Sequence, residues 1–255
     1  MNTVMQERSR IHAIHPMVNA FRLDWQRLNS GGKASSMAVY LVMLPVLALL
    51  FGLLSEGGGS SDMMMPVLGG MASGVFVMLP VYTFVYESQG MSRWMNGVIP
   101  IRRGHQVSGR YLVVLSVGLL LAVELTVSAL IMAVMADAGT WRAAMEGYAA
   151  NIAVIPVIYL LIESVLCPLL YRMPLQKAML VLFGVAAALF GIGWITVELC
   201  SNVLSVTQMA VVLGALETLA NLEAGSLALI AAVVDVVALV VSYACSLRIY
   251  RAKEL

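Results

Sequence analysis

YLVVLSVGLLLAVELTVSALIMAVM, residues 111–135, has one charged side chain, Glu124, in an otherwise apolar run. A helix of about 20 predominantly apolar residues crosses the hydrocarbon core of a bilayer. A run of this length and composition is typical of a transmembrane helix rather than of a loop or a strand. We therefore predict that residues 111–135 form a membrane-spanning helix.

Five further runs of the same kind lie along the chain, at about 36–54, 63–86, 148–170, 178–198 and 226–248. A membrane barrel would instead show alternating strands of about ten residues. Hydrophobic residues make up 61% of the chain and charged residues 11%, against about 25% charged in soluble domains. This composition excludes a soluble enzyme, a nucleic-acid binder and a disordered protein. We predict an all-α integral membrane protein with six transmembrane helices in one domain, residues 1–255.

Basic residues gather on one side of the six predicted spans. They precede the first span, fill the second and fourth connections and follow the last span; of the 15 Lys and Arg residues, only Arg142 lies on the other side. Cytoplasmic loops of membrane proteins carry the excess of basic residues. Both termini are therefore predicted to be cytoplasmic.

The segment of about 16–29, before the first span, has the pattern of an amphipathic helix. Its apolar stripe, which begins just upstream, consists of Ile14, Val18, Phe21, Trp25 and Leu28. The other faces carry Arg22, Asp24, Gln26 and Arg27. Such a helix lies in the membrane interface, with Trp and Arg side chains as anchors. It is either a plain anchor or a link between a cytoplasmic partner and the first span.

The second connection, residues 87–110, combines apolar and basic side chains in a cytoplasmic loop. Trp94, Met95, Val98 and Ile99 lie among Arg93, Arg102 and Arg103. Apolar residues surrounded by arginine are typical of a docking surface, and the alternative is a segment bound to lipid headgroups. On the outer side, about 199–222 contains an apolar stretch too short to cross the membrane, which indicates either a re-entrant helix or a surface loop.

Three acidic residues fall inside predicted spans: Glu124, Glu163 and Asp235. An unpaired charge near the bilayer centre costs about 2.5–3.5 kcal/mol on insertion scales. We therefore expect these side chains to face protein or a water-filled cavity, and to be either protonated or hydrogen-bonded to neighbours such as Ser128, one turn after Glu124. They either line a path for cationic or amphipathic cargo or join helices to one another.

Two further patterns bear on packing and chemistry. Gly70 and Gly74 form a GxxxG spacing, which favours the close approach of another helix. The sequence has no GxxxxGK[ST] loop for ATP, and its three cysteines have no metal-ligand spacing. We expect neither a catalytic residue nor a bound metal or cofactor in this chain.

The motifs around the second connection resemble those of the permease subunit of ABC-2 type exporters, in the branch of small bacterial peptide and drug exporters. Glu87 ends the second span, Pro100-Ile101-Arg102-Arg103 follows, and Arg110-Tyr111 opens the third span. The family more often has Lys where Arg110 stands. The resemblance implies a coupling helix between the second and third spans, and a short re-entrant segment before the sixth. It assigns ATPase docking to Glu87, Arg93, Trp94, Met95, Ile99, Pro100, Arg102 and Arg103.

The resemblance also implies an assembly in a bacterial plasma membrane. Two copies of a separate ATPase would bind ATP and Mg²⁺, and a second permease chain, identical or homologous, would complete the path. The substrate would be an amphipathic peptide toxin, bacteriocin or drug, exported by alternating access. Two alternatives remain: an autonomous ion-coupled carrier using Glu124 and Asp235, and a non-transport membrane immunity or scaffold protein.

Overall fold

The computed structural model describes residues 16–30, 36–55, 61–88, 103–136, 141–203 and 224–252. These residues are helical except at the short turn between two helices at residues 173–174, and this part of the chain contains no strand. The helices are α2 (Pro16–Ser30), α3 (Ser36–Ser55), α4 (Ser61–Ser88), α6 (Arg103–Ala136), α7 (Trp141–Arg172), α8 (Leu175–Val203) and α10 (Ala224–Ala252).

In the part of the chain that the structure describes, five helices are long and apolar enough to cross a membrane. They contain Met64–Val85, Gly104–Met135, Ala144–Arg172, Leu175–Glu198 and Leu229–Ala252. They coincide with the predicted second to sixth spans. The predicted first span is α3, a helix of 20 residues, in which the apolar stretch Leu41–Leu53 is shorter than the other five. The all-helical class is confirmed, whereas the six-span topology and the side on which the termini lie stay predictions.

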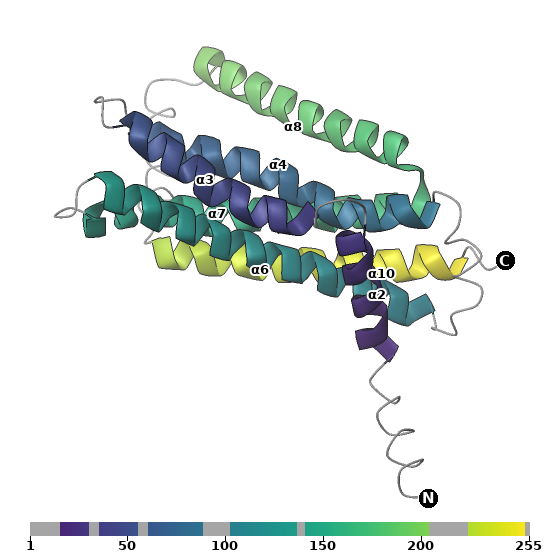
Figure 1. The fold of residues 1–255 in the computed structure, drawn as a ribbon. Helices are drawn as coiled ribbons and strands as arrows, with labels where there is room; N and C mark the ends of the chain where they lie inside the picture. Colours follow the sequence, from purple (N-terminus) through teal and green to yellow (C-terminus); the bar gives the residue numbers. More distant parts are fainter. Residues whose placement is uncertain are drawn as a thin grey trace, which may run out of the picture.

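Helix α6 lies at the centre of the bundle and contacts α2, α3, α4, α7 and α10, as Figure 1 shows. Glycine allows two close approaches to α7, one from α6 and one from α4. A Cβ atom added to Gly118 of α6 would lie 3.0 Å from Cε1 of Tyr159 on α7, and one added to Gly69 of α4 would overlap the Ile155 side chain. The central helices therefore pack with little space between them.

The expected GxxxG contact does not form within the described part of the chain. A Cβ atom on Gly70 or Gly74 would meet nothing within 4 Å, while Gly69 and Ala72 face the core. Adjacent residues in a helix point about 100° apart, so the close contact at Gly69 leaves the Gly70 face of α4 directed outward.

Helix α8 stands apart from the other spans and packs against α7 (Figure 1). Its first turns are attached, because Ala178 is fully buried. Farther along, Phe183, Phe190 and Trp194 are 66–75% exposed. An apolar helix with such exposure is suited to lipid or to another protein surface.

The second connection is shorter than predicted. Helix α4 continues to Ser88 and α6 begins at Arg103, so residues 103–110 belong to a helix rather than to a loop. Two polar side chains on these turns, Gln106 and Ser108, bond to α10, as described below. The docking residues Arg93, Trp94, Met95, Ile99, Pro100 and Arg102 lie outside the described residues, as does 204–222 of the predicted re-entrant segment, while 199–203 continue α8.

Candidate functional site

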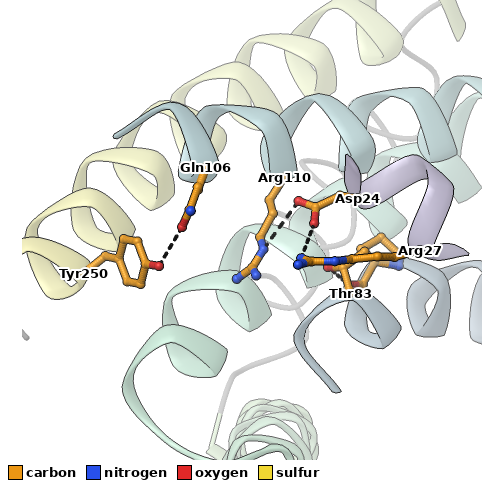
Figure 2. A network of polar contacts seen from close by, with 7 residues as sticks. Asp24, Arg27, Thr83, Gln106, Arg110 and Tyr250 are labelled. Atoms are coloured by element: carbon orange, nitrogen blue, oxygen red, sulfur yellow. Dashed lines mark hydrogen bonds and ion pairs between the residues drawn. The ribbon is translucent and has the colours of Figure 1, made fainter. Parts of the chain in front are cut away.

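Three helices of the bundle and the short helix α2 meet around Arg110, about two turns into α6. The Arg110 side chain is 5% exposed, and its Nε lies 3.6 Å from Oδ2 of Asp24 on α2, as Figure 2 shows. Its guanidinium carbon lies 4.2 Å from the ring centre of Phe84 on α4 and 5.3 Å from that of Tyr171 on α7. We call Asp24, Arg27, Phe84, Arg110 and Tyr171 the Arg110 cluster.

Asp24 has two positively charged neighbours. Arg27 Nη1 donates a hydrogen bond of 2.9 Å to Asp24 Oδ1, and Arg110 faces the other carboxylate oxygen. The Asp24 side chain is 6% exposed, and a buried carboxylate is tolerated only when paired. The cluster is therefore a network in which one buried carboxylate faces two arginines, with Arg110 also stabilised by the faces of two aromatic rings.

The position of Asp24 corrects the predicted orientation of the interfacial helix. Ala20, Asp24 and Leu28 are the buried residues of α2, and their spacing of four places them on one face. The prediction had placed Asp24 among the polar residues turned away from the apolar stripe. The ion pair with Arg110 instead turns this carboxylate into the bundle.

The remaining predicted residues of the interfacial helix lie beside that buried face. The rings of Phe21 and Trp25 stack with centroids 5.5 Å apart and are half-buried. Arg22 is exposed, whereas Arg27 turns back to Asp24. Val18, on the same stripe, is 38% exposed, so part of the apolar stripe stays available to lipid.

Helix α2 approaches α6 closely because Gly109 has no side chain. A Cβ atom there would lie 2.8 Å from the Ala20 Cβ and 2.9 Å from the Phe21 backbone nitrogen. Any larger residue would have to displace the α2 backbone. We call the contact of Ala20 and Asp24 with Gly109 and Arg110 the α2–α6 contact.

Helix α10 is bonded to the same end of α6. The Tyr250 hydroxyl donates a 2.7 Å hydrogen bond to Gln106 Oε1, visible in Figure 2. The other bonds join hydroxyl groups: Ser108 with Tyr243 at 2.9 Å, and Tyr111 with Ser242 at 2.6 Å and Ser246 at 2.8 Å. The Tyr250 ring also lies 5.2 Å from that of Tyr171, which connects α10 to the Arg110 cluster.

The three acidic residues within the spans are buried but do not come together. Glu163 is 1% exposed, Asp235 4% and Glu124 8%. The Cys167 thiol donates to Glu163 Oε2 at 3.7 Å. Among the described residues, Glu163 Oε1, Glu124 Oε2 and Asp235 Oδ1 have no hydrogen-bond partner, and the Ser128 hydroxyl has none either. The bond from Ser128 to Glu124, one of the two alternatives, is therefore not formed.

The described residues contain no group of three or more His, Cys, Asp or Glu side chains that could hold a metal ion. Of the predicted docking residues, Glu87 lies in α4 and Arg103 in α6, and their side chains are outside the described part of the structure. The structure brings Arg27, a predicted residue of the interfacial helix, together with Asp24 and Arg110, which were not among the predicted site residues. Arg110 stood out in the sequence only through the family resemblance.

Comparison with known proteins identifies the family of this chain. Residues 32–251 match the family described as ABC-2 family transporter protein. No match was found among curated proteins or among solved structures. Because the match extends over most of the chain, this protein belongs to the ABC-2 family of transporter proteins.

Proposed function

We propose that this chain is the transmembrane subunit of an ATP-driven exporter and works with a separate ATPase. Membership of the ABC-2 family and the long apolar helices support a permease. The sequence has no P-loop, so ATP and Mg²⁺ would bind to the partner. We expect two ATPase copies and a second permease chain, in a bacterial plasma membrane with both termini cytoplasmic.

The observation that carries this proposal is the position of the Arg110 cluster. Helix α6 begins at Arg103, the last of the predicted docking residues. Arg110 contacts side chains from α2, α4 and α7. A movement of the loop would therefore reach several helices through one buried residue, as a permease driven from outside the membrane requires.

The predicted docking surface consists of an apolar centre with basic residues around it. Trp94, Met95 and Ile99 would insert into the ATPase, and Arg93, Arg102 and Arg103 would surround them. Closure of two ATPase copies on ATP would move the two loops and switch the opening of the path between the two sides of the membrane.

We propose an amphipathic substrate: a peptide toxin, a bacteriocin or a drug. The buried acids Glu124, Glu163 and Asp235 would attract a cationic group once the helices separate, because each has an oxygen without a partner. They are candidates for the path. No described contact joins Glu124 to Asp235, so the geometry does not favour a carrier that uses them as one ion site.

A site-specific photo-crosslink tests the docking proposal. A benzophenone amino acid replaces Met95 in the full chain, expressed in its native host, and the adducts are identified by mass spectrometry. We expect an adduct with a P-loop ATPase. The same amino acid at Trp194, exposed on α8, is the control and should give none. Absence of an ATPase adduct from positions 94, 95 and 99 would contradict the proposal.

A further inference from the structure

The α2–α6 contact combines two kinds of interaction at one place. Backbone atoms of α2 lie against Gly109, with a hypothetical Cβ 2.9 Å from the Phe21 nitrogen. Next to it, Asp24 of α2 is paired with Arg110 of α6, and both side chains are at most 6% exposed. The backbone contact at Gly109 fixes the separation of α2 and α6, and the Asp24–Arg110 pair fixes their register.

This contact resists opening for a physical reason. Separating Asp24 from Arg110 within the bundle would break an ion pair between two buried side chains, and breaking a buried pair is strongly destabilising. Arg110 is also held between the rings of Phe84 and Tyr171. A small movement of α6 therefore displaces α2 with it more easily than it separates the pair.

Helix α2 leads directly to the first predicted span. Residues 31–35 alone separate the end of α2 at Ser30 from the start of α3 at Ser36. At the other end of α3, a Cβ atom added to Gly52 would lie 2.6 Å from Sδ of Met135 on α6. Helix α3 is thus connected to α6 by close packing near one end and through α2 at the other.

We propose that the α2–α6 contact stays closed throughout the transport cycle and carries ATPase-driven movement of the coupling loop to α3, with Asp24 as the positioning residue. This inference rests on the proposed function. Asp24 keeps α2 in register with α6, so α2, α3 and α6 move as one body. Helix α8, which is attached by its first turns, moves relative to them.

Distances between spin labels in the intact complex test this. The full chain, purified with its ATPase and placed in lipid nanodiscs, carries labels on a ketone-bearing amino acid, so the native cysteines remain. One pair joins Gln26 of α2 to Leu119 of α6, and the second joins Val42 of α3 to Phe190 of α8; all four positions are exposed. Pulsed electron paramagnetic resonance compares the nucleotide-free state with the state trapped by ATP and vanadate.

We expect the Gln26–Leu119 distance to stay the same in both states and the Val42–Phe190 distance to change. In Asp24→Asn, the first distance distribution should broaden and the change at the second pair should fall by at least half. Arg22→Asn, which removes an exposed charge from the same helix, should match the wild type. Asp24→Glu should restore both signals.

A Gln26–Leu119 distance that shifts on ATP in the wild type would overturn the inference, and this result needs no variant that must fold. Asp24→Asn with both signals at wild-type values would overturn the role of Asp24. Failure of any ATPase to purify with the wild-type chain would contradict the proposed function instead. A bound ATPase with no nucleotide-dependent change at either pair would overturn the inference alone.

Discussion

Gly109 of α6 lies directly against Ala20 of α2: a Cβ atom at position 109 would be 2.8 Å from the Ala20 Cβ. Two real Cβ atoms do not approach so closely without displacement of the backbone. The interfacial helix is therefore packed on the start of the third predicted span rather than lying freely on the membrane surface. The neighbouring Asp24–Arg110 pair depends on this approach.

Substitution of Gly109 by valine should displace α2 and weaken the bundle. Overpacking of a close contact costs about 1–3 kcal/mol, and the loss would appear as a lower thermal unfolding midpoint of the detergent-solubilised chain. Gly74→Val is the matched control, because a Cβ atom there meets nothing within 4 Å. Equal midpoints for the two variants would contradict the α2–α6 contact.

Arg110→Lys should keep the charge opposite Asp24 but lose the planar group that lies over Phe84. A double-mutant cycle with Phe84→Leu should give a coupling of about 1–2 kcal/mol in the free energy of unfolding. Phe183→Leu, on the exposed face of α8, should be additive with Arg110→Lys. If the unfolding free energies of Arg110→Lys and Phe84→Leu were additive, the contact between Arg110 and the Phe84 ring would contribute nothing to stability.

Glu163→Gln should fold with a stability within about 1 kcal/mol of the wild type. Among the described residues the carboxyl has no basic partner, and it accepts a hydrogen bond from Cys167, which an amide oxygen also accepts. Size-exclusion profiles and thermal unfolding measure this outcome. Complete loss of folded protein would mean that an ionised carboxylate is required at this position, and Cys167→Ser is the control for the bond itself.

Fusion reporters should place both termini in the cytoplasm. A green fluorescent protein after Leu255 should fluoresce, and alkaline phosphatase at the same position should be inactive. Alkaline phosphatase inserted after Thr140, before α7, should be active, because this connection lies beside the single basic residue assigned to the outer side, Arg142. An active enzyme at Leu255 would contradict the orientation.

The apolar runs predicted the helices well, because every backbone polar group in lipid must be paired within the segment. The runs of about 63–86 and 178–198 became α4 and α8 with ends extended by a few residues. The largest extension is at α6, which begins at Arg103. Residues such as Gln106 and Ser108 look like loop residues in the sequence, but they bond to Tyr250 and Tyr243 on α10.

Contacts between distant helices could not be predicted from local patterns. Asp24 looked like a water-facing residue of an amphipathic helix, since nothing nearby in the sequence indicates Arg110 as its partner. The Glu124–Ser128 bond, one of two alternatives for Glu124, does not form, because a spacing of four puts two side chains on one face without fixing their rotamers. The GxxxG spacing at Gly70 likewise could not specify which face of α4 meets the core.

The central claim is that a separate ATPase drives this chain through the second connection. Purification of the tagged chain from its native host in mild detergent, with partners identified by mass spectrometry, tests it most directly. We predict a P-loop ATPase in about equal amount, lost in Trp94→Asp/Ile99→Asp and retained in Arg172→Gln/Lys177→Gln, which alters the fourth connection. Recovery of the wild-type chain intact and alone, without an ATPase, would contradict the account.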